Sequence, residues 1–295
     1  MQQTFPMMKN FVQSALFGGG RSASEATVKK AAQATVIQRA LGYFYGDSYQ
    51  ARAVRGTALT VLSFGGQNLL RLASNLILTR LLFPEAFGLM VLVQVVLSAA
   101  AMFSDVGLRD SIIRDERGSE TNFQNTVWTL QIVRGFILTG AILVLAQPLA
   151  RFYEEEILAD LLLLSAFVPA VHGFESTKIH LANRELILGR LTALSLGSQV
   201  VGIATMVLLA IWLNSVWALA IGGIVGAATA VVLSHLIMPG APNRLYFERD
   251  AARRVFGYGK YIFLATIASY LLSQGDRAVL GKFATLETLA VYNIG

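Results

Sequence analysis

The chain has 295 residues, of which 55% are hydrophobic and only 14% are charged. Soluble domains carry about 25% charged residues, so this composition excludes an ordinary soluble domain and indicates a membrane protein. There is no cysteine, which excludes a disulfide framework and a thiolate metal site. The basic residues behind the net charge of +6 lie between apolar segments, so they favour an orientation signal in a membrane over nucleic-acid binding.

The first 54 residues differ from the rest because they are polar and are interrupted by three glycines, Gly18 to Gly20. The segment 7–17 is too short and too weakly apolar for a strong secretory signal. An amphipathic helix over 22–40 agrees with the capping-box spacing of Ser22 and Glu25. We therefore expect residues 1–54 to form a tail or a surface helix.

Seven apolar segments and the start of an eighth follow from residue 55. They cover 58–82, 86–105, 123–146, 159–179, 188–212, 215–238 and 255–272, and the last begins near 286. Each complete segment is close to the roughly 20 residues that a bilayer-spanning helix needs. Lys and Arg lie unequally around them: counted from Arg39 onward, 13 precede the first segment or lie in even-numbered loops, against 4 in odd-numbered loops. This asymmetry predicts a cytoplasmic N-terminus and cytoplasmic even-numbered loops.

The first apolar segment carries an arginine, Arg71, near its middle. Polar residues flank it at four-residue spacing, and at 100° per residue they share one face of a helix: Ser63, Gln67, Asn75 and Thr79. A charge at the bilayer centre costs roughly 2.5–3.5 kcal/mol on insertion scales. We therefore expect this face to point into a helix bundle or a watery cavity.

A second arginine, Arg134, lies about halfway along the third segment, beside Gln131. Two buried arginines that line a cavity could bind a diphosphate, because guanidinium groups can replace the water around its charge. Alternatively, each arginine pairs with a carbonyl or carboxylate of a neighbouring helix and only stabilises the bundle. The predicted substrate-binding residues are Arg71, Asn75, Gln67 and Arg134.

Two charged pairs lie near the ends of apolar segments. Asp105 and Arg109 in the sequence DVGLR fit either a turn or a gate between two lobes. Asp276 and Arg277 fit either a gating pair between lobes or a local pair at the membrane interface. We predict gating or interlobe contacts for these four residues.

Catalytic and metal-binding patterns are not found in the sequence. The three histidines do not combine with carboxylates at metal-ligand spacing. His172 and Glu175, three residues apart, would suit a proton relay or a polar pair at a helix end. We predict a protein that is not an enzyme, with no metal and no cofactor; a coupling proton or sodium ion stays open.

The chain also repeats itself weakly at an offset of 202 residues. LTRLLFPEAFGLMVL from Leu78 aligns with LGKFATLETLAVYNI from Leu280, so that Arg80 meets Lys282 and Glu85 meets Glu287. Two membrane hairpins can resemble each other by chance. A true repeat predicts two six-helix lobes in the same orientation, with the first lobe over 55–254 and the start of a second over 255–295. Because the eighth segment has only about ten residues, we expect a fragment or truncated form.

Several stretches carry a resemblance to a known family that covers about 55–295. They are ARAVRG with the first segment, SNLILTRLLFPEAFG at 74–88, FSDVGLRDSIIR at 103–114, FQNTVWTLQIVRG at 123–135, PLARFY at 148–153, LANREL at 181–186 and QGDRAVLGKF at 274–283. With these stretches the chain resembles the Wzx-type oligosaccharide flippases, polysaccharide-biosynthesis membrane proteins of the multidrug/oligosaccharidyl-lipid/polysaccharide exporter superfamily.

The resemblance implies a multi-pass inner-membrane protein with 12 to 14 helices in two lobes around a polar cavity. Such a protein moves undecaprenyl-diphosphate-linked glycan from the cytoplasmic to the periplasmic leaflet for polysaccharide or lipopolysaccharide biosynthesis. The implied partners are membrane lipid, the lipid-linked oligosaccharide, a polysaccharide polymerase and a chain-length regulator, and not nucleic acid. The chain departs from the family in length, since it lacks most of the second lobe.

Two other functions stay open. A drug or cation antiporter of the same superfamily should have a carboxylate deep in an early helix, where this chain has Arg71. A non-transporting membrane scaffold of a polysaccharide-synthesis complex agrees with the short chain. We predict an all-α polytopic membrane protein of the flippase type that works by alternating access.

Overall fold

The computed structural model describes residues 49–104 and 107–294, and within these ranges the regular elements are all helices. The chain divides into two compact units, residues 1–58 and 59–295. The polar segment predicted over 1–54 lies almost entirely outside the described residues. The cavity and the surfaces considered below belong to the second unit.

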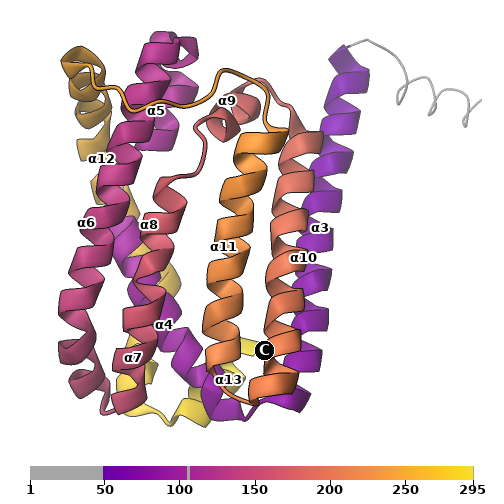
Figure 1. The fold of residues 1–295 in the computed structure, drawn as a ribbon, viewed down its shortest axis with the longest axis vertical. Coiled ribbons are helices and arrows are strands. Elements are labelled where there is room, and N and C mark those ends of the chain that lie inside the picture. Colours follow the sequence, from indigo (N-terminus) through magenta and orange to yellow (C-terminus); the bar gives the residue numbers. More distant parts are fainter. Residues whose placement is uncertain (1–48, 105–106, 295) are drawn as a thin grey trace, which may run out of the picture. The chain divides into compact units, whose positions relative to one another are not determined.

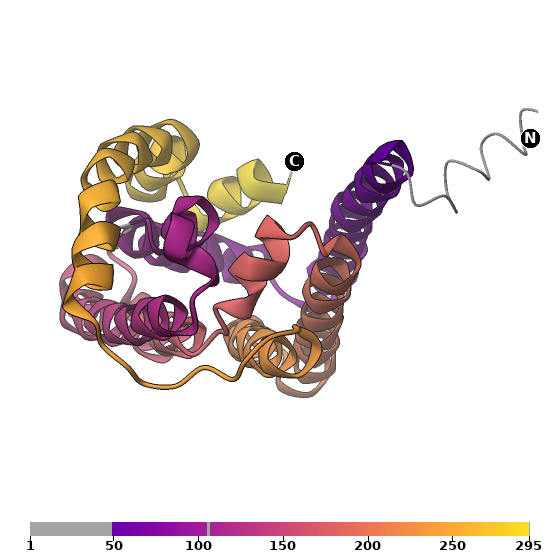
Figure 2. The ribbon, with the colours of Figure 1, turned by 90° about the horizontal axis from the view of Figure 1, so that it is seen from above.

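The described part of the chain contains nine helices that form the body and three short ones between them (Figure 1). The nine are α3 (Tyr49–Leu81), α4 (Pro84–Phe103), α6 (Thr121–Tyr153), α7 (Glu156–Ser165), α8 (Phe167–Gly173), α10 (Leu188–Leu213), α11 (Trp217–Ile237), α12 (Arg249–Phe283) and α13 (Leu286–Ile294). The short ones are α5 (Leu108–Arg114), η1 (Glu116–Ser119) and α9 (Lys178–Arg184). Figure 2 shows α10 and α11 beside each other, with α6 further along the same side.

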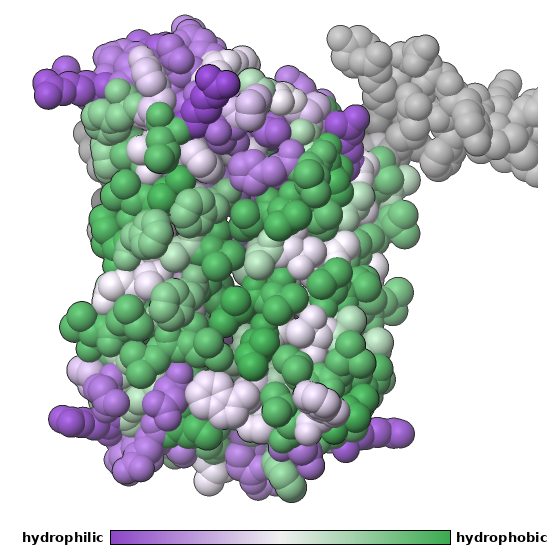
Figure 3. All heavy atoms as spheres, in the orientation of Figure 1, coloured by the Kyte–Doolittle hydropathy of each residue, from purple (hydrophilic) through white to green (hydrophobic). Residues whose placement is uncertain are grey.

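Five of the described helical segments are long and apolar enough to cross a membrane. They are Pro84–Met102, Thr121–Tyr153, Glu156–Gly173, Leu188–Leu213 and Trp217–Ile237. In Figure 3 a hydrophobic band separates two hydrophilic ends of the visible face, as a protein embedded in a bilayer requires. The predicted all-α polytopic membrane fold is confirmed, whereas its division into one six-helix lobe and the start of a second stays a prediction.

The first predicted segment, 58–82, forms one continuous helix within α3, but it is not among these five. The polar residues around Arg71 lower the mean hydropathy of this helix. The opposite face remains strongly apolar, because Leu62, Leu69 and Leu76 expose 61%, 69% and 62% of their surface. The helix is therefore two-sided, with one lipid-like and one polar face.

The fourth predicted segment, 159–179, is interrupted rather than continuous. α7 ends at Ser165 and α8 begins at Phe167. Pro169 has no N–H group to bond the carbonyl of Ser165, and its ring crowds that carbonyl, which breaks the helix there. The nearby carbonyl of Ala166 accepts a hydrogen bond from the Thr139 hydroxyl of α6 at 2.7 Å. A hydroxyl from the neighbouring helix therefore satisfies one backbone group at the break.

Helices α10 and α11 approach each other closely at glycines. A Cβ atom on Gly202 would lie 3.2 Å from the Cα atom of Gly226 and 3.3 Å from the carbonyl oxygen of Gly222. Small residues permit such backbone contact between membrane helices. Gly222 and Gly226 in the GGIVG sequence of α11 therefore permit close packing against α10.

The helix ends follow the internal repeat. α3 ends at Leu81 and α4 begins at Pro84, while α12 ends at Phe283 and α13 begins at Leu286. Both boundaries are displaced by the 202 residues of the sequence alignment. The second hairpin packs against the first, because Gly88 of α4 lies directly against the backbone of Leu286.

Two buried clusters hold the elements that matter below. The larger one joins α4 to α7 through residues with no exposed surface, such as Leu92, Val93 and Leu158. The smaller one lies at the end of the bundle that carries α5 and anchors the start of α12. Its members are Leu108, Ile112, Phe123, Val127, Ala251 and Val255.

Candidate functional site

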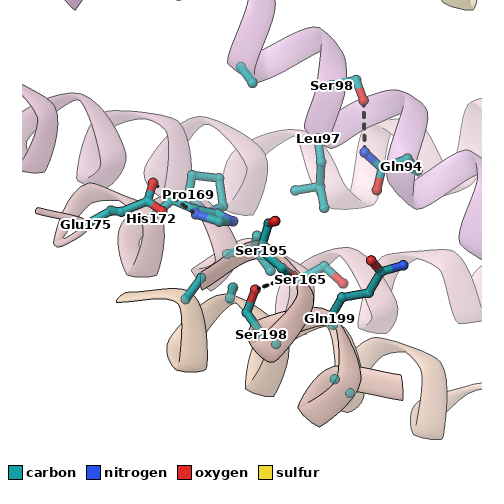
Figure 4. A pocket seen from close by; sticks show the side chains of 18 of the residues that line it. Gln94, Leu97, Ser98, Ser165, Pro169, His172, Glu175, Ser195, Ser198 and Gln199 are labelled. Atoms are coloured by element: carbon teal, nitrogen blue, oxygen red, sulfur yellow. Dashed lines mark hydrogen bonds and ion pairs between the residues drawn. The ribbon is translucent and has the colours of Figure 1, made fainter. Parts of the chain in front are cut away.

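A cavity of about 1190 Å³ lies between the helices of the second unit. Its walls come from α3, α4, α6, α7, α8, α10 and α11, and residues of α5 and α9 line it as well. Figure 4 shows part of this lining, in which Gln94 and Ser98 face Ser195 and Gln199 across the space. The cavity is large enough for the polar head of a sizeable ligand.

Eleven of the residues that line the mainly apolar cavity carry amide or hydroxyl side chains. They come from five helices: Gln67, Asn68, Ser74, Asn75, Gln94, Ser98, Gln131, Ser165, Ser195, Ser198 and Gln199. Amides and hydroxyls both donate and accept hydrogen bonds. This lining can therefore solvate water or the hydroxyl groups of a sugar within a membrane protein.

The polar stripe of α3 supplies one wall of the cavity, as its spacing predicts. Gln67, Arg71, Ser74 and Asn75 all line the space. The Gln67 amide donates to the Ser195 hydroxyl of α10 at 3.5 Å, and Gln199 of α10 donates back to the Gln67 carbonyl at 3.0 Å. These bonds fix the rotation of α3 so that its polar face points inward.

Arg71 is the least constrained of the predicted binding residues. Its side chain is exposed at the cavity wall. It forms no hydrogen bond or ion pair with any residue that the structure describes. The bundle-stabilising alternative required such a partner, so the guanidinium of Arg71 is available to a ligand.

Arg134 lines the same cavity but is held by α4. Its Nε donates to the Ser104 hydroxyl at 2.9 Å, and its Nη2 donates to the Ala101 carbonyl at 2.5 Å. Both acceptors lie at the C-terminal end of α4, where the helix dipole favours a positive charge. Arg134 therefore joins α6 to α4, in addition to any contact with a ligand.

The predicted gating residues lie in different places. Arg109 on α5 lines the cavity, whereas Asp105 lies outside the described residues. Asp276 accepts a hydrogen bond from the Tyr292 hydroxyl at 2.5 Å and one from the backbone N–H of Arg277 at 2.8 Å. Neither Asp276 nor Arg277 lines the cavity, so these bonds belong to the α12–α13 hairpin. Gating by any of them stays a prediction.

Glu175, His172 and His180 complete the charged lining, and the predicted site did not include them. Glu175 is the one carboxylate among the described lining residues. Its Oε2 lies 4.0 Å from Nδ1 of His172, and Figure 4 shows the two side chains beside each other. Burial raises the pKa of Glu175. Only the three-residue spacing of His172 and Glu175 gave a sequence signal; nothing in the sequence placed them in the cavity.

The amide of Gln131 organises this corner. It donates to the carbonyls of His172, Gly173 and Glu175 at 3.0, 3.4 and 3.1 Å. The His172 carbonyl also accepts the backbone N–H of Glu175 at 3.0 Å, so Gln131 adds a side-chain donor to the carbonyls at the end of α8. Gln131, expected only to accompany Arg134, therefore caps α8 and holds Glu175 at the cavity wall.

The cavity as a whole has a positive charge balance. Its described lining contains three arginines, Arg71, Arg109 and Arg134, against the single carboxylate of Glu175. Low-dielectric walls strengthen the interaction of such charges with a ligand. The arrangement can bind an anion whose remaining surface is rich in hydroxyl groups.

His180 on α9 gives this site a testable response to acid. Burial, followed by the positive charge of Arg109, lowers the pKa of His180 from 6.5 to about 4. Between pH 6.5 and 4 the unfolded chain therefore binds a proton that the folded chain does not. We expect the free energy of unfolding to decrease as the pH is lowered from 6.5 to 4, by at most about 3 kcal/mol from this group.

A His180→Gln variant should lose this part of the acid sensitivity in unfolding experiments at pH 5 and pH 7.5. Arg109→Gln serves as the comparison and should reduce the sensitivity without removing it, because burial remains. An unchanged pH dependence in His180→Gln would show that another group is responsible.

Comparison with known proteins identifies the family. The model of a family described as "Polysaccharide biosynthesis protein" matches residues 77–295. The chain is also similar to the "Succinoglycan biosynthesis transport protein ExoT" of Rhizobium meliloti (strain 1021), with 23% identity over 241 residues. That match covers 81% of the chain and 48% of the relative, so the chain spans about half the length of this curated relative. No solved structure matches. Since the family match covers most of the sequence, the chain belongs to the polysaccharide biosynthesis protein family, as its resemblance to the Wzx-type flippases predicts.

Proposed function

We propose that this protein transports a lipid-linked glycan across the inner membrane for polysaccharide biosynthesis, and that it is not an enzyme. The substrate would be an undecaprenyl-diphosphate-linked oligosaccharide, moved from the cytoplasmic to the periplasmic leaflet. The observation that carries the proposal is Arg71, which lines the cavity and has no hydrogen-bond or ion-pair partner among the described residues.

The chemistry of the cavity fits both parts of such a head group. A diphosphate brings negative charge, which Arg71, Arg109 and Arg134 can neutralise with charge-assisted hydrogen bonds. The amide and hydroxyl groups can exchange hydrogen bonds with sugar hydroxyls. The lipid tail, in contrast, can stay in the bilayer while the head group crosses.

A cationic substrate is less compatible with this lining. It would meet three arginines and one carboxylate, Glu175, whose Oε2 lies 4.0 Å from the His172 ring. Repulsion between like charges in a low-dielectric cavity opposes binding of a cation. This argues against the drug or cation antiporter as the function.

The relative's name, a succinoglycan biosynthesis transport protein, supports the substrate class. Because the chain spans about half of that relative, we assign transport to a two-lobe assembly that encloses the cavity. A polysaccharide polymerase and a chain-length regulator would then receive the product. A cytoplasmic N-terminus, the gating pairs and a coupling proton or sodium ion belong to the same proposal.

Binding to the purified chain in lipid nanodiscs tests the proposal without requiring transport. The two ligands should share the same oligosaccharide and the same polyprenyl tail, one joined by a diphosphate and the other by a neutral ether. We expect the diphosphate ligand to bind at least about tenfold more tightly, because charge-assisted hydrogen bonds are each worth roughly 1.5–3 kcal/mol. Equal affinity for the two ligands would contradict an anion-binding cavity.

A further inference from the structure

The segment that joins α11 to α12 is an extended strap of eleven residues, 238–248. In Figures 1 and 2 it runs over the outside of one end of the bundle, from α11 to the start of α12. It lies apart from the cavity, since none of its residues lines that space. Its role must therefore be sought outside the proposed transport site.

Hydrogen bonds to α6 hold the strap in one conformation. The backbone N–H groups of Arg244, Tyr246 and Glu248 donate to α6 side chains. The acceptors are Asn125, Thr129 and Thr126, at 3.0, 3.1 and 3.1 Å. The strap is thus held at every second residue, and the side chains between these positions are held in place as well. Because the strap is already ordered, binding of a ligand to these side chains costs little further conformational entropy.

The intervening Leu245 and Phe247, and Tyr246 between them, have exposed side chains. Leu245 exposes 72% of its surface, Phe247 exposes 56% and Tyr246 exposes 43%. Three consecutive large apolar or aromatic residues on the outside of a fixed loop are unfavourable in water. Aromatic residues of this kind are typical of the boundary between a membrane and water.

The position of the strap along α6 agrees with that boundary. α6 has 33 residues and is about 50 Å long, whereas the hydrocarbon core is about 30 Å thick. Measured from Tyr153 at the other end, Thr129 and Asn125 lie about 36 and 42 Å along the helix axis. With Tyr153 placed at the opposite edge of the hydrocarbon core, the strap lies about 6 to 12 Å beyond it, at the level of the lipid head groups.

Charges around the strap are not balanced within the protein. Arg244, Arg249 and Arg253 have exposed side chains that form no hydrogen bond or ion pair with the described residues. The two neighbouring carboxylates are already occupied by other arginines. Arg117 lies 2.9 Å from Glu248 and 3.3 Å from Asp250, and Arg254 lies 3.4 Å from Asp250.

Helix stability does not explain these three arginines either. Arg249 and Arg253 lie in the first turns of α12, where the helix dipole disfavours positive charge. The start of α12 is fixed by the buried side chains of Ala251 and Val255 instead. The three guanidinium groups are therefore left to act on something outside the chain.

We propose that the strap is a binding site for anionic phospholipid. The phosphate of the head group would bind at Arg249 and Arg253, which lie one helical turn apart on α12, or at Arg244 further along the strap, while Leu245 and Phe247 reach from the head-group level toward the acyl chains. Charge complementarity selects an anionic lipid, and the exposed apolar residues select a lipid over a free phosphate ion. This site is independent of the glycan-binding cavity and of its proposed function.

Native mass spectrometry of the whole chain released from mixed nanodiscs tests this site. The nanodiscs contain equal amounts of phosphatidylglycerol and phosphatidylcholine, and the readout is the ratio of the two lipids retained on the protein. We expect Arg244→Gln/Arg249→Gln to lower this ratio at least about fivefold, because each basic residue near an anionic surface is worth about 1 kcal/mol. Inorganic phosphate at 10 mM (roughly, the level of a phosphate buffer) should leave the ratio of the unmodified chain unchanged.

The matched control is Arg80→Gln/Arg151→Gln, which removes the same charge from exposed arginines on α3 and α6. It should keep most of the preference for phosphatidylglycerol. Leu245→Ser/Phe247→Ser retains all the arginines and should let inorganic phosphate compete, because the lipid-selective contacts are gone. An unchanged lipid ratio in the strap variant, or an equal loss in the control, would overturn the proposal. With either outcome, the arginines of the strap would instead be assigned to binding an acidic segment of another protein.

Discussion

Replacing Arg71 with alanine should reduce the affinity for a diphosphate-linked oligosaccharide by about 10- to 150-fold, with the fold intact. The reason is that the Arg71 guanidinium lines the cavity without any partner among the described residues. Its loss removes charge-assisted hydrogen bonds worth roughly 1.5–3 kcal/mol from the ligand and none from the protein. Binding in nanodiscs measures the first effect, and thermal unfolding in detergent measures the second.

Conservative variants separate a binding role from a structural one. Arg71→Lys should recover only part of the affinity, because an ammonium group cannot form the bidentate fork that a guanidinium forms with phosphate. Arg80→Ala is the control on the same helix, since Arg80 is exposed and does not line the cavity. Normal binding by an Arg71→Met variant would refute the role in substrate binding. The ability of these variants to complement a flippase-deficient strain should follow the order of their binding affinities.

The polar stripe of α3 is the part of the site that could be predicted best. Helical periodicity fixes which residues share a face, and the cost of a charge in lipid decides which way that face must point. Both arguments are local. For this reason Gln67, Arg71 and Asn75 could be placed on one cavity wall before any neighbouring helix was known.

Other parts depended on contacts between distant segments, which spacing does not encode. The break between α7 and α8 follows from Pro169, yet the helix is tolerated there because Thr139, 27 residues earlier than Ala166, supplies a hydrogen bond. His180 and Glu175 come to the cavity wall only through the packing of α9 and the cap that Gln131 provides. The sequence predicted one continuous segment over 159–179 and missed the break between α7 and α8, because the apolar residues continue past Pro169.

Arg71 and Arg134 were predicted as equivalent, and their surroundings now distinguish them. Arg71 lies on a helix face whose neighbours are amides, so a ligand must supply its counter-charge. Arg134 instead donates to Ser104 and Ala101, which satisfies the end of α4. The same residue type at a similar depth can therefore bind a ligand in one helix and join two helices in another.

The expected consequence is that Arg134→Ala lowers protein stability together with activity. The variant leaves the Ala101 carbonyl and the Ser104 hydroxyl without the Arg134 donors, which should cost roughly 1.5–3 kcal/mol of unfolding free energy. Thermal unfolding and membrane abundance should fall in step with glycolipid binding, unlike the pattern for Arg71→Ala. A double-mutant cycle with Ser104→Ala isolates the contact: the two changes should be non-additive, because the second removes a hydroxyl that no longer accepts a hydrogen bond from Arg134. Unchanged stability of Arg134→Ala, with weakened binding alone, would instead return Arg134 to the same class as Arg71.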